Sequence, residues 1–395
     1  MPSVTIVPAR DRLLADLTDA LSALEADGLR RRLTTLEAID GPRVRLAGRE
    51  LINWCSNDYL GLAGDPRLAR AASEAAAAWG VGARASRLLA GTTRVHQQLE
   101  EALARWFHAE AALVYPSGYL ANLGVLGAVC SAEDLILLDR LSHASLVEAA
   151  RASGAKVQVF RHGDVEQVAG LLRRGPPARR RLIVTEGVFS MEGDRAPLAE
   201  LAEVAEAHEA LVYVDDAHGA FVLGATGRGS PEAAGVSHER FLYMGTLGKA
   251  LGCQGGFVIG PRPFIDWCTN RSRAFVYTTA LAIPTAAAAT AALEICEREP
   301  ERRIRLHDRR QGLSTQLAGL GLPARDPSHI VPIITGTPER ANALARGLWD
   351  RGMWAPAIRP PTVPKGTARI RLSLTALHTE RHVDALLGAL RDLVA

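Results

Sequence analysis

Short apolar runs alternate with helical patterns through the middle of the chain, from about residue 111 to residue 260. Each run is too short for a helix and is followed by a turn and then by a stretch of helical periodicity. This alternation is typical of parallel strands covered by helices on both faces. The seven runs predict an α/β fold with a mostly parallel seven-stranded sheet; they are 113–115, 135–138, 157–160, 182–185, 211–214, 241–244 and 256–259.

The two ends of the chain follow other patterns. Leucines at near-helical spacing predict an amphipathic helix over 11–32, and two short apolar runs around a glycine turn predict a hairpin of 44–46 and 51–54. Helical patterns follow at 65–79 and 95–107. After residue 285 a long helix precedes strands at 331–334 and 369–374 and a closing helix over 379–393. We therefore expect an N-terminal helix and hairpin (1–55), a large domain (56–285) and a smaller α+β domain (286–395).

Composition excludes several classes of protein. No apolar run reaches the roughly 18 residues of a membrane span, and the first residues lack the apolar core of a secretory signal, so we expect a cytoplasmic protein without membrane contact. A net charge of +3 gives no reason to expect nucleic-acid binding. The five cysteines have no CxxC spacing, so we expect reduced thiols and no metal site.

Lysine is rare in this chain, which makes one lysine informative. The 46 basic residues include only Lys156, Lys249 and Lys365, so 43 are arginines. Arginine keeps its proton in proteins, whereas a lysine amine can be desolvated and can attack a carbonyl. Lys249 follows the predicted strand 241–244 in an apolar, glycine-flanked stretch, at the strand end where ligands of α/β proteins bind.

Polar residues follow several of the predicted strands. Gly118 lies where a strand runs into a helix, a setting in which free backbone N–H groups bind phosphate. Asp215 and His218 follow the strand 211–214. Taken alone, Asp215 could cap a helix, His218 could be a buried core histidine, and Lys249 could be a solvated loop residue. Taken together, they favour pyridoxal 5′-phosphate, which a lysine holds as a Schiff base while a carboxylate keeps its ring nitrogen protonated.

With these residues in place, the chain resembles the pyridoxal-phosphate α-oxoamine synthases over about residues 20–393. The blocks that carry the resemblance occur in the order of the family, at 57–62, 141–145, 186–194 and 214–219. The resemblance implies a fold-type-I transferase, active as a homodimer. Two positions depart from the family pattern: Arg84 stands where small residues are usual, and Gly248 where serine is also common.

The resemblance also implies roles for individual residues. Lys249, His143, Asp215 and His218 would be catalytic, with His143 stacked on the cofactor ring and Asp215 on its nitrogen. Thr279 would reach the phosphate of the partner subunit's cofactor. The remaining implied contacts are Gly118, Tyr119 and Thr246 to phosphate, Ser190 and His218 to the oxygen side of the ring, and Arg30, Asn57, Arg359 and Thr362 to substrate.

The stretch 358–364 most resembles the family members of biotin synthesis. It implies condensation of L-alanine with a pimeloyl thioester, carried by coenzyme A or by acyl carrier protein, with loss of carbon dioxide. A glycine-using relative is the alternative within the family. A nicotinamide-dependent oxidoreductase would need a GxGxxG motif after its first strand, and a non-catalytic scaffold would have no use for Lys249.

Overall fold

A computed structural model describes residues 8–322 and 328–394 of the chain. The chain forms two compact units. Unit 1 comprises residues up to 55, 332–372 and those from 384 onward, and unit 2 comprises 56–331 and 373–383. Residues 286–331 thus belong with the large sheet and not with the C-terminal segment, because the helix α11 (Ile283–Arg298) packs against α2 (Pro66–Trp79) and α3 (Arg94–Phe107).

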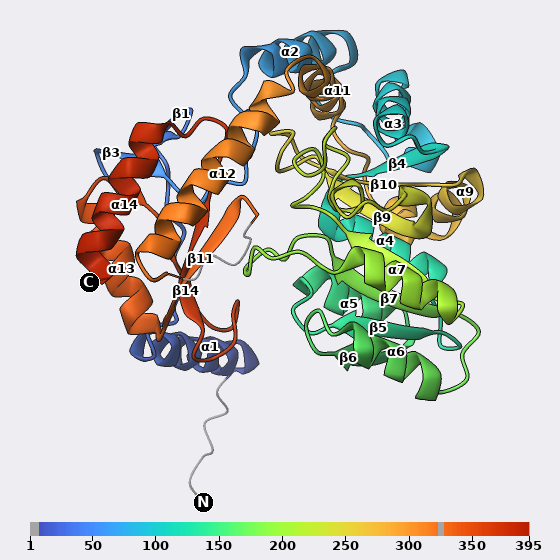
Figure 1. Cartoon of the computed structure of the whole chain (residues 1–395). Helices are drawn as coiled ribbons and strands as arrows, with labels where there is room; N and C mark the ends of the chain where they lie inside the picture. Colours follow the sequence, from blue (N-terminus) through green and yellow to red (C-terminus); the bar gives the residue numbers. More distant parts are fainter. Residues whose placement is uncertain (1–7, 323–327, 395) are drawn as a thin grey trace, which may run out of the picture. The chain divides into compact units, whose positions relative to one another are not determined.

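Unit 2 contains the predicted seven-stranded sheet (Figure 1), in the order β4-β10-β9-β8-β7-β5-β6. Five neighbouring strands are parallel, and β10 is antiparallel to both β4 and β9. The mostly parallel sheet is therefore confirmed. Its strands are β4 (Ala111–Tyr115), β5 (Leu135–Asp139), β6 (Lys156–Phe160), β7 (Arg181–Glu186), β8 (Leu211–Asp215), β9 (Phe241–Thr246) and β10 (Gly256–Gly260).

Both faces of the sheet are buried along β4, β5 and β7–β10, which explains why these strands are apolar without alternation. The edge strand β6 is partly exposed, with Val159 at 51%. On one face, Tyr213 and Met244 join the core under α4 and α5. On the other, Tyr243 and Phe257 pack against the ring of Phe107 from α3. The other helices of the unit are α4 (Gly118–Val129), α5 (Ala144–Ala152), α6 (Val165–Arg174), α7 (Leu198–Ala207), α8 (Ser230–Ala233), α9 (Arg262–Arg271), α10 (Arg273–Val276) and α12 (Glu301–Gly319).

Helix α4 begins directly beyond the carboxyl end of β4. Ser117 caps it, because its hydroxyl accepts a hydrogen bond from the backbone N–H of Leu120 at 3.2 Å. The first N–H groups of the helix, those of Gly118 and Tyr119, have no acceptor in their own helix. Because β4 runs in the same direction as β8 and β9, these N–H groups lie at the edge of the sheet where β8 and β9 also end.

Unit 1 contains two small sheets. One has the order β1-β2-β3-β12, where β3 (Arg49–Asn53) pairs with β2 (Arg43–Leu46) as the predicted hairpin and with β12 (Met353–Trp354) in parallel. The other has the order β11-β14-β13. The remaining elements are β1 (Ala38–Asp40), β11 (Ile330–Gly336), β13 (Ala357–Ile358), β14 (Ala368–Ser373), α13 (Pro338–Asp350) and α14 (Glu380–Val394), of which β11, β14 and α14 extend into unit 2.

Helix α1 (Ala9–Ala26) is shorter than predicted. It ends before Arg30, and none of its residues is buried, although five leucines lie along it. The pattern also missed α12, α13 and the strands β1, β12 and β13. Strands of two or three residues have no measurable period, and only Glu299 and Pro300 separate α12 from α11.

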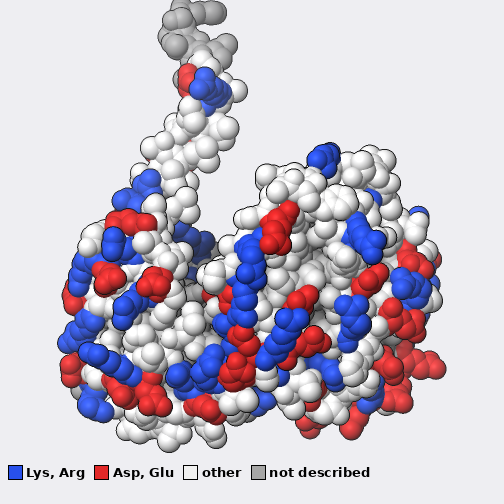
Figure 2. Space-filling model, turned by 90° about the horizontal axis from the view of Figure 1, so that it is seen from above, with Lys and Arg blue, Asp and Glu red and all other residues white. Residues whose placement is uncertain are grey.

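Among the described residues, no helix combines the length and the apolar character that crossing a membrane requires. On the face shown in Figure 2, positive and negative side chains are interspersed, in keeping with the net charge of +3.

Glycine is required where β10 passes the start of α4. A Cβ on Gly256 would lie 2.6 Å from both Cα and N of Gly118. We expect Gly256→Ala to lower the free energy of unfolding by about 1–3 kcal/mol through this overpacking. The matched control is Gly127→Ala in α4, where an added Cβ meets nothing within 4 Å; it should raise stability by about 0.5–1 kcal/mol. Urea denaturation measures both, and equal effects of the two variants would contradict the close approach.

Candidate functional site

The register of the sheet brings the predicted strand-end residues together. Asp215 at the end of β8 lies beside Glu186 of β7 on one side and Met244 of β9 on the other. The chain that leaves β9 reaches Lys249 five residues after Met244. The sheet thus places two carboxyl groups and one amine-bearing loop on neighbouring strand ends.

Lys249 belongs to a chain of hydrogen bonds. Its Nζ lies 2.7 Å from Nε2 of His218, whose Nδ1 lies 2.6 Å from the hydroxyl of Tyr59. The Tyr59 hydroxyl donates to Oδ1 of Asn57 at 3.0 Å, so its oxygen accepts from Nδ1–H of His218. This fixes the imidazole tautomer that presents the lone pair of Nε2 to the amine. His218 and Tyr59 are buried, whereas Lys249 is half-buried.

Asp215 is held by neutral donors. Its Oδ2 accepts from Nδ2 of Asn122 at 2.7 Å and its Oδ1 from the backbone N–H of Ala217 at 3.0 Å. The amide oxygen of Asn122 accepts from the hydroxyl of Tyr213 at 2.7 Å. The carboxylate is only 5% exposed and keeps a fixed orientation. Within the part of the chain that the structure describes, both of its hydrogen-bond donors are neutral, so it can serve a cationic group of a ligand.

His143 and Ser190 are tied to one buried carboxyl group. Glu186 accepts from the backbone N–H of His143 at 2.7 Å and from that of Ser190 at 3.3 Å. Burial, with the nearby Asp215 as second cause, raises the pKa of Glu186 well above its ordinary value. Nδ1 of His143 lies 2.8 Å from the hydroxyl of Ser145, which also accepts from Asn122. The His143 ring is exposed and is available to cover a planar ligand.

Two of the residues predicted to bind phosphate, Gly118 and Thr246, lie side by side. An added Cβ on Gly118 would lie 3.7 Å from the side chain of Thr246, so the start of α4 and the end of β9 are neighbours. Thr246 donates to the carbonyl of Gly255 at 2.8 Å and accepts from the N–H of Gly248 at 3.1 Å. The Tyr119 side chain points elsewhere: its hydroxyl donates to Glu148. Only the backbone N–H of Tyr119 is therefore available to a phosphate.

Thr279 lies apart from the hydrogen bonds of this group. It forms an isolated antiparallel bridge with Ser86 and is exposed. The site of the chain itself therefore comprises residues of unit 2 other than Thr279. The predicted contribution of Thr279 to a partner subunit stays a prediction.

The predicted substrate residues other than Asn57 lie in unit 1, around the end of α1. Arg359 donates to the carbonyl of Gly28, and Arg31 donates to the hydroxyl of Thr362 at 2.8 Å. Arg30 instead pairs with Glu25 at 3.3 Å. Arg359 and Thr362 thus share one small region of unit 1, with Arg31 beside them.

The side chains of unit 2 fit pyridoxal 5′-phosphate by their chemistry. They offer an amine for its aldehyde, an oriented carboxylate for its ring nitrogen, an exposed imidazole for its ring face and a helix start for its phosphate. A metal is not indicated: within the described residues, no group of three or more His, Cys, Asp or Glu side chains is placed to hold one.

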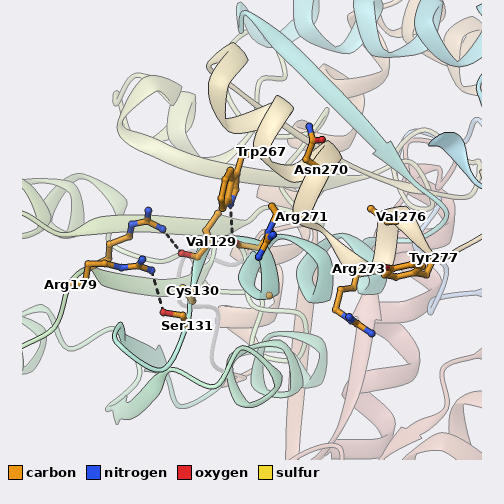
Figure 3. Close-up of a pocket in the computed structure, with 13 residues that line it drawn as sticks. Val129, Cys130, Ser131, Arg179, Trp267, Asn270, Arg271, Arg273, Val276 and Tyr277 are labelled. Atoms are coloured by element: carbon orange, nitrogen blue, oxygen red, sulfur yellow. Dashed lines mark hydrogen bonds between the residues drawn. The ribbon is translucent and has the colours of Figure 1, made fainter.

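A hollow of about 540 Å³ lies at the other end of α4 (Figure 3). It is lined by several arginines but contains none of the predicted site residues. Two of its side chains bond the last carbonyls of the helix: Trp267 donates to Ala128 at 2.8 Å and Arg180 to Val129 at 2.7 Å. Trp267 and Arg180 therefore cap the C-terminal end of α4, which accounts for their place in this hollow.

Some members of the site were not singled out from the sequence. Asn122, Ser145, Tyr59 and Glu186 lie inside or beside the motifs, but their roles depend on partners distant in sequence. The signal that could have found Asn122 is its place one helical turn after Gly118, which turns it toward the same strand ends.

Comparisons with known proteins agree with this geometry. The family described as aminotransferase class I and II matches residues 49–390. An 8-amino-7-oxononanoate synthase of Anaeromyxobacter dehalogenans is 50% identical over 94% of this chain and 93% of its own length, and one of an Azoarcus species is 45% identical over 97% of each.

Solved structures show the same fold. A serine palmitoyltransferase variant of S. paucimobilis, with a bound PLP–myriocin aldimine, superposes with a TM-score of 0.91 at 31% identity over 97% of each chain. The 8-amino-7-oxononanoate synthase of Francisella tularensis superposes with a TM-score of 0.76 at 27% identity, over 87% of this chain and 98% of its own.

The role of Asn122 can be tested by a matched pair of variants. Asn122→Leu removes the donor to Oδ2 of Asp215 and to the Ser145 hydroxyl and the acceptor of the Tyr213 hydroxyl. It should lower the free energy of unfolding by about 1–3 kcal/mol for each buried polar atom left unpaired. Tyr213→Phe leaves the bond from Asn122 to Asp215 intact and should cost less. Urea denaturation compares them, and a Tyr213→Phe loss equal to that of Asn122→Leu would show that the bond to Asp215 carries no stability.

Proposed function

We infer the reaction of this chain from one premise: it belongs to the class I and II aminotransferase family, in which its relatives at 45–50% identity are 8-amino-7-oxononanoate synthases. It is a pyridoxal-phosphate-dependent acyltransferase of biotin biosynthesis. We propose that it condenses L-alanine with a pimeloyl thioester and releases carbon dioxide and the thiol, to give 8-amino-7-oxononanoate. The glycine-using alternative is not favoured by the names of these relatives.

One observation carries the proposal. The amine of Lys249 lies 2.7 Å from Nε2 of the buried His218, and Lys249 stands in the loop after β9, the strand that pairs with β8 and its terminal Asp215. When bound, pyridoxal 5′-phosphate supplies a ring that stabilises negative charge on the α-carbon of an amino acid. Lys249 would hold the aldehyde at rest and, once released, take the α-proton of alanine at Nζ.

The other residues of unit 2 would orient the cofactor and polarise the thioester. Asp215, oriented by Asn122 and the Ala217 N–H, would keep a proton on the ring nitrogen. His143 would cover the ring and donate to the thioester oxygen as the new carbon–carbon bond forms. The N–H groups at the start of α4, with Thr246, would hold the phosphate.

Four residues are proposed to contact the substrates. A guanidinium binds a carboxylate through two parallel hydrogen bonds, which suits Arg359 for the carboxylate of alanine. Arg30, Thr362 and Asn57 would contact the acyl substrate. The carrier of the pimeloyl group is coenzyme A or acyl carrier protein.

We also propose a cytoplasmic homodimer. Support comes from α1, on which Leu13, Leu17 and Leu21 are 56%, 51% and 43% exposed, since an apolar helix face in water gains by packing on another chain. The exposure of Thr279 agrees with a role in the partner subunit's site.

Lys249→Ala tests the central residue. We expect a folded protein without visible absorption from a covalently held cofactor, and turnover reduced by several powers of ten, because the amine is lost. Lys156→Ala, at the exposed start of β6, is the control and should behave as the unaltered protein. Borohydride reduction followed by peptide mass mapping locates the cofactor; its attachment to another lysine of the unaltered protein would refute the assignment.

Arg359→Lys tests the alanine site. Lysine keeps the charge but not the planar fork, so we expect a higher KM for alanine and a lower kcat, because a misoriented Cα–H bond slows proton removal. Arg351→Lys, an exposed arginine of unit 1 whose nearest acid is Asp392 at 3.8 Å, should change neither. Steady-state kinetics with L-alanine and a pimeloyl thioester decides, and unchanged alanine kinetics in Arg359→Lys would move the carboxylate site elsewhere.

A further inference from the structure

His162, two residues beyond β6, bonds two carboxylates with its two ring nitrogens. Nδ1 lies 3.1 Å from Oδ1 of Asp139, and Nε2 lies 2.8 Å from Oδ2 of Asp194. Its ring meets the ring of Phe189 edge-on, with centroids 4.3 Å apart. A neutral imidazole has one N–H, so only the imidazolium donates to both carboxylates. His162 therefore joins β5 to the loop after β7 through two charge-assisted bonds.

The first of these carboxylates shapes the turn that leads to His143. Asp139 ends β5, and its Oδ1 also accepts from the N–H of Leu141 at 2.9 Å. Its backbone carbonyl accepts from the N–H of Ser142 at 3.1 Å. The side chain is 2% exposed. His162, which bonds the Asp139 carboxylate, therefore helps to orient the turn immediately before His143.

The second carboxylate belongs to Asp194, whose backbone closes the loop that carries Ser190. The carbonyl of Asp194 accepts from the N–H of Phe189 at 3.0 Å, and the carbonyl of Phe189 accepts from the N–H of Gly193 at 2.8 Å. Ser190 lies inside this closed loop. Glu186 already joins the N–H groups of His143 and Ser190. His162 joins the same two segments, the His143 turn and the Ser190 loop, through Asp139 and Asp194.

We propose that His162 is a positioning residue which, as an imidazolium bridging Asp139 and Asp194, holds the His143 turn and the Ser190 loop in the arrangement that receives the cofactor. The proposal rests on the proposed function, because it takes His143 and Ser190 as cofactor contacts. It assigns His162 no contact with cofactor or substrate.

The charge of His162 has a defined pH range. Burial acts to lower the pKa of His162, but the hydrogen bonds to Asp139 and Asp194 outweigh it and raise the pKa to about 10. These two carboxylates, from β5 and from the loop after β7, are the charged groups that face its ring. Since the folded pKa is raised, the bridge makes its full contribution to the free energy of unfolding below about pH 6.5, and this contribution is lost as the pH rises through about 10.

The test compares His162→Gln with His238→Gln in the full-length protein. His238 is equally half-buried, but its Nε2 bonds only the carbonyl of Arg228, at 2.8 Å, and burial lowers its pKa. We expect the dissociation constant for pyridoxal 5′-phosphate, titrated by visible absorption at pH 7.5, to rise about tenfold or more in His162→Gln, because neutral glutamine removes both charge-assisted bonds. His238→Gln should stay within about twofold.

Two further measurements separate positioning from stability alone. The visible circular dichroism of the bound cofactor should change in His162→Gln and not in His238→Gln. The difference in Tm between unaltered protein and His162→Gln, both without cofactor, should shrink from pH 7 to pH 10. If His162→Gln does not fold, Asp194→Asn at the half-exposed end of the bridge replaces it, with the same expected directions.

The outcomes distinguish the two proposals. If the unaltered protein binds no pyridoxal 5′-phosphate, the proposed function fails. If it binds the cofactor and His162→Gln matches His238→Gln in affinity and circular dichroism, or if the Tm difference does not depend on pH, the inference on His162 is overturned while the proposed function stands.

Discussion

Two carboxyl groups buried side by side at the ends of β7 and β8 constrain the rest of the site. Glu186 and Asp215 are register partners and are 2% and 5% exposed, so ionising both would place two like charges in a poorly solvated region. Burial and the nearby Asp215 raise the pKa of Glu186 well above its ordinary value, which lowers the cost of the pair. Glu186 binds the backbone N–H groups of His143 and Ser190, whereas Asp215 is oriented by Asn122 and the N–H of Ala217. The two carboxyl groups thus differ in their partners and not in their residue class.

The frame around these carboxyls is stiff because it is made of packed strands and helix starts. Gly256 lets β10 pass the first residues of α4 at a distance that no side chain tolerates, and Asn122 on that helix orients Asp215. Lys249 stands on the adjacent loop with its amine on His218. A lysine amine that must add to a carbonyl and later move a proton needs such fixed neighbours, because misplacement by about 1 Å already costs much of the rate.

The residues proposed for the cofactor and those proposed for substrate lie mostly in different units. Unit 2 holds every residue that would meet the cofactor within one chain, on the ends of parallel strands. Unit 1 holds the arginines proposed for substrate, near the end of a helix whose leucines are exposed. Recognition of different amino acids and thioesters within the family can thus vary in unit 1 while the chemistry in unit 2 stays the same.

The sequence by itself determined the seven-stranded sheet, because buried parallel strands are apolar runs. It also predicted Lys249 as the cofactor lysine, because a single strand-end lysine among so many arginines is unusual. Only the tertiary structure decided the partners. Asn122 and Asp215 are 93 positions apart, Tyr59 and His218 are 159 apart, and His162 and Asp194 are 32 apart. The tertiary structure also pairs Asn53 of β3 with Trp354 of β12, so an N-terminal and a C-terminal segment share one sheet of unit 1. Periodicity reports which face of an element is buried, whereas hydrogen bonds between distant segments depend on strand order and register, which no local pattern contains.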